Sequence, residues 1–131
     1  MKKFIYKNSL TLCLAWTLII FILCATPGQY IPSADWLELL SFDKFVHASM
    51  FFILATLTLL TLIKNKKSKV TLVISFLMCI AYGALLEFMQ AICFSNRSAD
   101  WKDMVANTFG CAMALLTFKK IKMLISQQSN L

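Results

Sequence analysis

Long apolar stretches alternate with short polar segments along this chain. The apolar stretches span residues 10–25, 43–63, 70–92 and 101–118. Each approaches or reaches the ~20 residues that a helix needs to cross the hydrocarbon core of a bilayer. The pattern predicts an all-α membrane protein with four transmembrane helices. Residues 1–131 are expected to form a single transmembrane domain.

The composition supports this interpretation. The chain has 131 residues, of which 60% are hydrophobic and 15% are charged, and its mean hydropathy is +0.74. A typical soluble domain is about half apolar and about a quarter charged. Four membrane helices use almost all of this length, so no soluble domain of useful size fits beside them.

The lysines predict how the helices are oriented. Most of the thirteen basic residues lie in the segments 2–7, 64–69 and 119–122, and all six acidic residues lie outside these segments. Such a distribution predicts that both termini and residues 64–69 face the cytoplasm, in a multi-pass protein of the bacterial cytoplasmic (inner) membrane. Because topology accounts for the net charge of +7, no nucleic-acid partner is expected.

Residues 29–42 and 95–100 are then expected on the outer side. In the first of these segments, Ser33 can cap a short amphipathic helix between the first two membrane helices. The apolar face of that helix would consist of Trp36, Leu37 and Leu40. We expect this helix to lie on the outer membrane surface, with a lid over a ligand as the alternative.

The five cysteines carry no metal-binding or redox motif. None forms a CxxC pair, and all lie in or beside apolar stretches. Buried cysteine behaves as a small hydrophobic residue, so packing is the expected role. Cys24 and Cys93 should both come near the outer surface, which leaves a disulfide between them open.

Polar residues on three predicted helices fall at one depth. Glu87 follows Val70 by seventeen residues, or about 26 Å along the helix axis. This places it near the outer edge of a hydrocarbon core about 30 Å thick. His47 and Asn107 each lie about one helical turn inside the same surface. The sequence therefore predicts a polar layer below the outer turn.

These residues also share helix faces. The stripes consist of Asp43 and His47, of Gly83, Glu87 and Gln90, and of Asp103, Asn107, Gly110 and Ala114. Gly83, Gly110 and Ala114 are expected to pack helices closely, because small residues allow close approach in lipid. Ionisable groups within membrane helices usually have partners or a function. An outer-leaflet pocket is therefore predicted, with candidate binding residues Asp43, Lys44, His47, Glu87, Gln90, Arg97, Asp103 and Asn107.

Each candidate also has a purely structural interpretation. These are helix capping by Asp43, interfacial snorkelling by Lys44, packing by His47, pairing of Arg97 with Asp100 or Asp103, and a helix–helix tie by Asn107. Glu87 fits a structural role least well, because a carboxylate near hydrocarbon must be paired or neutral. No cofactor and no metal site is predicted.

The order and spacing of these residues resemble the VanZ-like family of small membrane proteins. The matching pattern is an Asp-Lys-x-x-His sequence at Asp43, Lys44 and His47, followed by Glu87-x-x-Gln90. After these come Arg97, an aspartate six residues later at Asp103, and Asn107-x-x-Gly110. The resemblance covers residues 43 to about 116. One departure is Ala114, where a second glycine often stands.

The resemblance implies a membrane protein connected with the cell envelope. The family takes its name from resistance to the glycopeptide teicoplanin, and it supplies no catalytic roles. One hypothesis is a binding or accessory protein for a membrane lipid, a lipid-linked cell-wall precursor or a lipoglycopeptide, with Lys44 and Arg97 engaging anionic groups.

Two further hypotheses stay open. The first is a membrane enzyme that acts on a lipid or cell-wall precursor. It would use His47 as a general base beside Glu87 or Asp103, or these three residues as metal ligands. A single histidine and the lack of an HExxH sequence weigh against the metal version. The second is a structural partner of another membrane protein.

Overall fold

The computed structural model describes residues 2–26, 42–63, 69–93 and 100–126, which form five α-helices and no strand. The helices are α1 (Lys2–Lys7), α2 (Ser9–Ala25), α4 (Phe42–Ile63), α5 (Lys69–Ile92) and α6 (Trp101–Ser126). The predicted all-α fold is confirmed for these residues, and the four long helices match the four apolar stretches. The predicted amphipathic helix within 29–42 lies outside the described residues.

Two helix ends differ from the sequence-based expectation. The basic start of the chain forms the short helix α1, and Asn8 separates it from α2. At the other end, α6 continues without a break through the basic residues after Phe118 to Ser126. Lysine is a good helix former, so a helix can continue beyond its apolar part.

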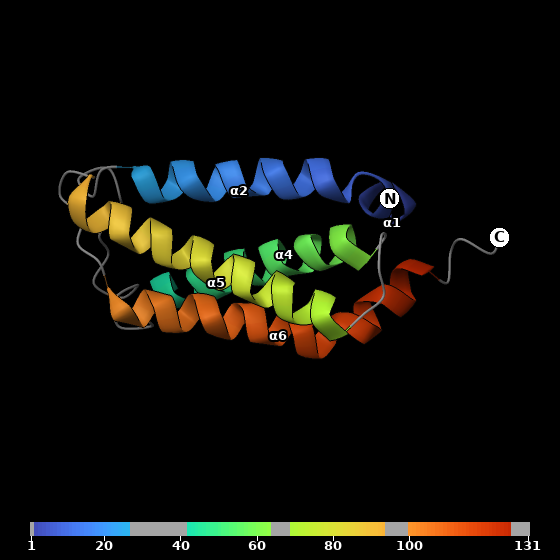
Figure 1. Ribbon diagram of the computed structural model, residues 1–131. Helices are drawn as coiled ribbons and strands as arrows, with labels where there is room; N and C mark the ends of the chain where they lie inside the picture. Colours follow the sequence, from blue (N-terminus) through green and yellow to red (C-terminus); the bar gives the residue numbers. More distant parts are fainter. Residues whose placement is uncertain (1, 27–41, 64–68, 94–99, 127–131) are drawn as a thin grey trace.

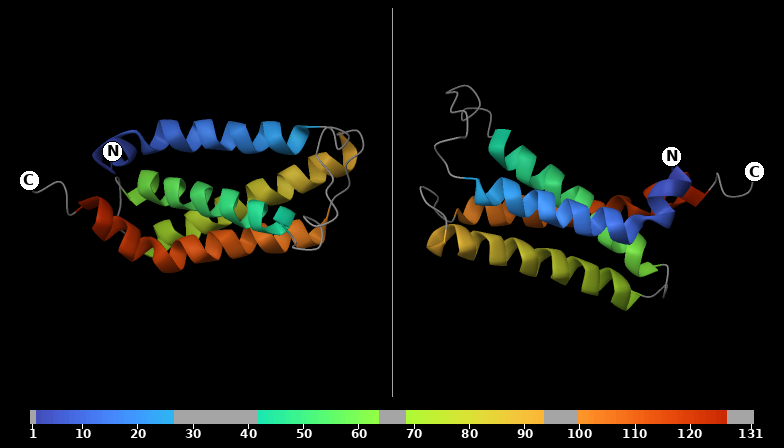
Figure 2. Two further views of the ribbon diagram at one scale, coloured as in Figure 1. Left: turned by 180° about the vertical axis from the view of Figure 1, so that it is seen from behind. Right: turned by 90° about the horizontal axis from the view of Figure 1, so that it is seen from above.

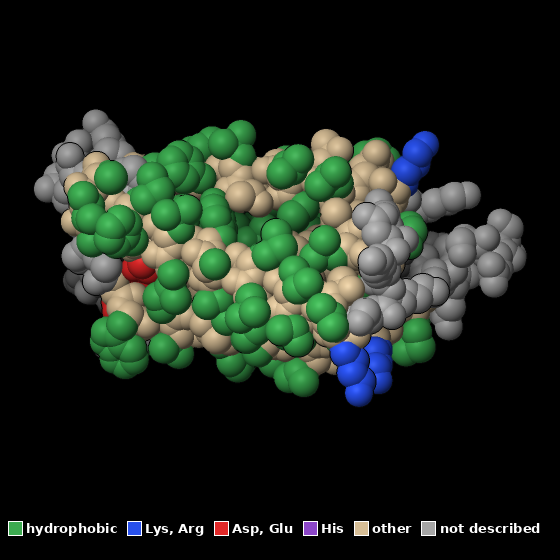
Figure 3. Space-filling view, in the orientation of Figure 1, with side chains coloured by type: hydrophobic (Ala, Val, Ile, Leu, Met, Phe, Trp, Pro, Cys, Tyr) green, Lys and Arg blue, Asp and Glu red, His purple; other side chains and the backbone are tan. Residues whose placement is uncertain are grey.

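The four long helices lie alongside one another and alternate in direction (Figures 1 and 2). One end of the bundle, which we call the acidic end, contains Asp43, Glu87, Asp100 and Asp103. The other end, which we call the lysine end, contains Lys7, Lys69, Lys119 and Lys120. Figure 3 shows this separation, with acidic side chains at one end and basic side chains at the other.

Much of the surface between the two ends is apolar (Figure 3). On α2, Leu10, Leu14, Leu18 and Ile22 are all exposed and lie four residues apart along one face. Among the described helices, α4 and α5 are long and apolar enough to cross a membrane, and α2 is apolar but shorter. An exposed apolar surface of this kind suits contact with lipid.

Small residues bring α4 and α6 into close contact. A Cβ atom added to Gly110 would lie only 2.1 Å from the backbone oxygen of Ala48, so this position requires glycine. Ala114, one turn further along α6, is completely buried. At Gly83 on α5, an added Cβ would meet the ring of Phe51 at 3.2 Å. All three small residues therefore lie at close contacts or at buried positions within the bundle.

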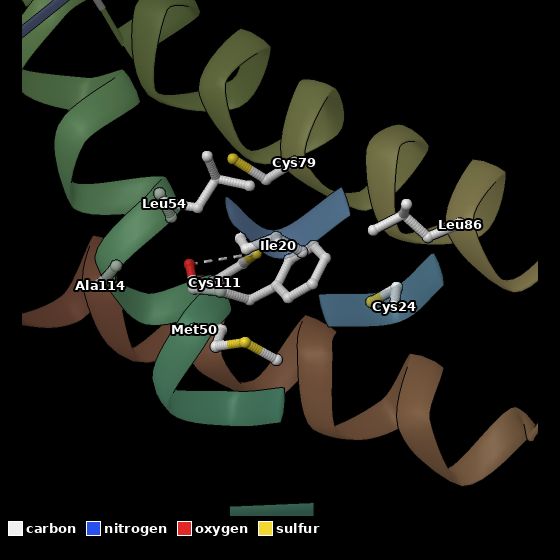
Figure 4. Close-up of a cluster of buried hydrophobic side chains, with 10 residues drawn as sticks. Ile20, Cys24, Met50, Leu54, Cys79, Leu86, Cys111 and Ala114 are labelled. Atoms are coloured by element: carbon white, nitrogen blue, oxygen red, sulfur yellow. Dashed lines mark hydrogen bonds between the residues drawn. The ribbon is translucent and has the colours of Figure 1, made fainter. Parts of the chain in front are cut away.

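The apolar core lies between the helices at mid-bundle (Figure 4). Its centre is formed by Ile20, Phe51, Leu54, Cys111 and Ala114, each at most 3% exposed. Hydrogen bonds also tie α2 to its neighbours. They include those from Trp16 Nε1 to the oxygen of Met50 at 3.0 Å and from the Tyr82 hydroxyl to the oxygen of Thr17 at 2.8 Å.

Cys24, Cys79 and Cys111 have the packing role that the sequence predicts, whereas Cys93 does not. Cys79 and Cys111 are buried, and both belong to the apolar core. The Cys24–Cys93 disulfide, which the sequence left open, is not formed. Cys24 is a buried thiol and Cys93 is an exposed one.

Candidate functional site

Lys44, in the first turn of α4, is surrounded by carboxylates at the acidic end. Its Nζ donates to Asp43 Oδ2 at 3.1 Å, to Asp100 Oδ2 at 3.0 Å and also to Asp103 Oδ1. An ammonium group has three N–H donors, and each has a carboxylate partner here. Lys44 therefore joins the first turn of α4 to the start of α6. Binding of an anion by Lys44, as one hypothesis requires, would have to displace an aspartate.

His47 lies one turn deeper, facing α6. Its Nδ1 is 3.1 Å from Asn107 Oδ1, and the two residues are 7% and 3% exposed. The amide oxygen of Asn107 can only accept, so Nδ1 carries the hydrogen. His47 Nε2 faces Asp43 Oδ1 at 3.8 Å and Asp103 Oδ2 at 3.7 Å. Both separations are too long for a hydrogen bond.

Glu87 joins the end of α5 to the start of α6. It is 7% exposed, and its Oε2 accepts the backbone N–H of Asp100 at 3.0 Å. Its side chain thus faces the protein, as predicted, and not the lipid. The nearby cation Lys44 binds aspartates, and Arg97 lies outside the described residues.

Asp100 belongs to the site, although the sequence analysis did not select it. Its Oδ1 accepts the backbone N–H of Lys102 at 2.9 Å, and its Oδ2 binds Lys44. These two interactions, in that order of size, hold the pKa of Asp100 below its ordinary value. The signal was present in the sequence, because an aspartate directly before a helix is a preferred N-cap residue.

Gln90 has a helix-tying role. Its Nε2 donates to the backbone oxygen of Cys24 at 3.3 Å, and the residue is only 3% exposed. This bond connects the ends of α5 and α2 at the acidic end. Gln90 thereby helps to fix the helices around the site.

The predicted polar layer is present. His47 and Asn107 are in direct contact, and Glu87 is buried beside the start of α6. A Cβ atom added to Gly83 would lie 3.4 Å from Asn107 Nδ2, so the small residue makes room for the amide. Three helices therefore contribute to one buried polar group of residues, which we call the polar layer: His47, Glu87 and Asn107.

The charged groups and the ring nitrogen of His47 determine what this site could bind. One lysine is matched to three aspartates, which leaves an excess of negative charge at the acidic end. Oxygen and nitrogen atoms of Asp43, His47 and Asp103 lie within 4.8 Å of one another, a grouping that could hold a metal ion. His47 Nε2 is the one ring nitrogen of the site with no hydrogen bond, so it could also act as a base.

Comparison with known proteins gives one assignment. No curated protein and no solved structure matches this chain. A family model described as VanZ/LLP1 matches residues 7–125, which include every described residue of the site. The resemblance found from the sequence motifs is thereby confirmed, and together with the two apolar helices α4 and α5 it indicates a membrane protein. The chain belongs to the VanZ/LLP1 family.

Proposed function

We propose that this protein binds the polar head group of a membrane lipid or of a lipid-linked cell-wall precursor in the outer leaflet of the bacterial cytoplasmic membrane. All four long helices would cross the membrane, with both termini and the lysine end on the inner side. The acidic end would then lie at the outer surface. Glycopeptide susceptibility, including resistance to teicoplanin, would follow from binding an envelope molecule at this site.

The observation that carries this proposal is the placement of the acidic end. Asp43 and Asp100 are partly exposed, with side-chain exposures of 66% and 37%, whereas Asp103 at 13% and the polar layer lie below them. The apolar surface begins immediately beside this end of the bundle (Figure 3). A molecule with an acyl chain and a polar head matches that combination, because lipid contacts the one part and hydrogen-bonding groups contact the other.

Binding is favoured over catalysis by the contacts of the same residues. The described site offers acceptors and one basic nitrogen, but no serine, threonine or cysteine nucleophile is in contact with His47 among the described residues. Glu87 is held by a backbone N–H group, and Lys44 is held by carboxylates. These contacts hold side chains in fixed positions, as a binding site requires, and they do not by themselves activate a group for reaction.

Native mass spectrometry of the protein extracted from its own membrane tests the binding function. We expect a lipid or lipid-linked precursor to remain bound to the wild-type protein. Asp43→Asn, which changes an exposed carboxylate of the site, should lower the bound fraction. Lys69→Gln, at the lysine end, is the matched control and should retain it. Equal lipid retention in both variants would contradict a head-group site at the acidic end.

The proposed topology has its own test. In a cysteine-free background, Lys67→Cys should react with a membrane-impermeant maleimide only after the cells are opened, because residues 64–69 are assigned to the cytoplasm. A cysteine placed at Ser98 should react in intact cells. Labelling of position 67 from outside would overturn the orientation and, with it, the outer location of the site.

A further inference from the structure

We propose that Asp43, His47 and Asp103 form a binding site for one divalent metal ion of the Zn²⁺ type. One ligand atom from each of these residues lies within 4.8 Å of the other two. The carboxylate oxygens that face His47 Nε2 are Asp43 Oδ1 at 3.8 Å and Asp103 Oδ2 at 3.7 Å. This departs from the sequence-based expectation of no metal site. It stands on geometry that is independent of the head-group proposal.

The orientation of His47 is the first argument. Its Nδ1–H donates to Asn107 Oδ1 at 3.1 Å, which fixes the ring and leaves the lone pair on Nε2. That lone pair points toward two carboxylate oxygens at 3.7 and 3.8 Å. In the neutral ring these three electron-rich atoms face one another, an arrangement that a metal ion bound between them would stabilise. A metal-binding histidine characteristically donates its other ring N–H to an oxygen in this way.

The position of Lys44 is the second argument. Its ammonium group binds Oδ2 of Asp43 and Oδ1 of Asp103, whereas His47 faces the opposite oxygen of each carboxylate. Lysine and a metal ion would therefore use different oxygen atoms and would not compete for them. Lys44 instead orients both carboxylates, as hydrogen-bond donors to metal-binding side chains do.

Distances and charge agree with a small divalent ion. Ligand atoms about 2.1 Å from a tetrahedral ion are roughly 3.4 Å apart. The separations of 3.7 and 3.8 Å between His47 Nε2 and the two carboxylates are close to this value, and all three ligand atoms lie within 4.8 Å of one another. The two ligand carboxylates of Asp43 and Asp103 share the single ammonium group of Lys44, so they keep an excess of negative charge. A divalent ion would offset this excess. One nitrogen and two carboxylate ligands suit Zn²⁺ and similar first-row ions more than Ca²⁺ or Mg²⁺.

A metal ion here would also change what the site can bind. Three protein ligands leave at least one coordination position open. The ligand Asp43 has a side chain that is 66% exposed, so the proposed site is reached from the acidic end. If the head-group proposal holds, a phosphate oxygen could take the open coordination position. The metal ion would then be the positively charged partner of the phosphate, a role that Lys44 does not offer because aspartates surround it.

Zn²⁺ titration of the purified, chelator-treated protein in detergent tests the site. Cys93 is an exposed thiol and a possible zinc ligand, so all variants are made in a Cys93→Ser background. We expect one Zn²⁺ per chain in the parent protein. His47→Gln and Asp103→Asn should lower the affinity at least tenfold, and Asn107→Ala should lower it by about 10- to 100-fold through loss of the ring orientation.

Lys102→Gln is the matched control. It changes an exposed charged side chain at the same end of the bundle, but it removes no atom that faces Nε2. Its Zn²⁺ affinity should stay within a few-fold of the parent value. Helix content and elution volume of each variant establish that it is folded. The proposal is overturned if the parent protein binds no stoichiometric Zn²⁺, or if Lys102→Gln weakens binding as much as His47→Gln does.

Discussion

Helices α4 and α6 meet in two different ways along their length. At mid-bundle they touch through backbone and small residues, where Gly110 faces the backbone oxygen of Ala48. At the acidic end the same two helices are joined through charged and polar side chains, with Lys44 bound to Asp103 and His47 bound to Asn107. The first contact depends on shape, and the second depends on hydrogen bonds and charge.

This difference distinguishes the contacts that hold the helices together from the groups that form a candidate binding site. Packing and a single polar pair would suffice to hold two helices together. The acidic end has three carboxylates around one lysine and, in addition, a buried glutamate. Carboxylates near hydrocarbon are costly in free energy, so helix packing does not explain this excess of carboxylates. Four predictions test the distinction between packing contacts and site residues.

The largest effect is expected at mid-bundle. Gly110→Ala places a Cβ atom 2.1 Å from a backbone oxygen of α4, so the two helices must move apart. We expect a loss of about 3 kcal/mol, at the upper end for overpacking of a core. The measurement is the melting temperature in detergent, together with the amount of protein in the membrane.

Gly83→Ala is the matched control for this change. There the added Cβ meets only the edge of the Phe51 side chain at 3.2 Å, and a ring can shift more easily than a backbone. Its loss should be below about 1 kcal/mol. If the two glycine variants were equally stable, the close contact of α4 and α6 would not be the main determinant of packing.

The next effect is expected at the acidic end. Lys44→Met keeps a long side chain but leaves three aspartates without their shared cation. Loss of one partner from a buried ion pair costs about 3–5 kcal/mol, and the 29% exposure of Lys44 should reduce this to about 2 kcal/mol. Thermal unfolding in detergent at pH 7 measures it.

Lys102→Met is the control for Lys44→Met. Lys102 lies at the same end of the bundle but is exposed. Its replacement should change the melting temperature very little. A Lys44→Met protein as stable as Lys102→Met would mean that the aspartates are not held by Lys44, and the site would then need another cation.

Helix positions and the polar layer could be predicted from the sequence, for physical reasons that are specific to this chain. Apolar stretches near membrane length fix where helices form. A rise of 1.5 Å per residue places Glu87, His47 and Asn107 at a similar depth. The glycine contacts followed from the preference for small residues between helices in lipid.

The partners within the site could not be predicted in the same way. The depth of each residue along its helix indicates which residues share a layer, but it does not indicate which atoms are in contact. The sequence indicated that the carboxylate of Glu87 must be paired or neutral, but not that it accepts the backbone N–H of Asp100. It also suggested an anion ligand for Lys44, whereas Asp43, Asp100 and Asp103 surround it. These pairings depend on helix rotation and on how the chain enters α6.

Glu87→Gln should separate function from stability. Glutamine retains an oxygen that can accept the N–H of Asp100, so the loss of stability should be below about 1 kcal/mol. Its charge is lost from the polar layer, so we expect lipid retention and the envelope phenotype to fall. Melting temperature, membrane abundance and glycopeptide susceptibility are compared with the wild type.

Glu87→Leu completes this experiment. It removes the acceptor for a buried N–H group and should cost about 1–3 kcal/mol. A well-folded Glu87→Gln protein with wild-type susceptibility would assign Glu87 a structural role only. That conclusion requires a strain in which deletion of the protein does change susceptibility.

The smallest effect is the pH dependence of Asp100. Its pKa is lowered in the folded protein by the N–H of Lys102 and by Lys44. A lowered folded pKa means that its contribution to stability is present above the unfolded pKa of about 3.9 and is lost as the pH falls through the folded pKa. The melting temperature of Asp100→Asn should therefore be slightly below that of wild type at pH 7, and the difference should shrink below about pH 4. In a Lys44→Met background the difference at pH 7 should be smaller, because one of the two interactions is already absent. A difference that stays constant from pH 7 to pH 3, or that grows on acidification, would show that Asp100 is not held as a carboxylate by these two partners.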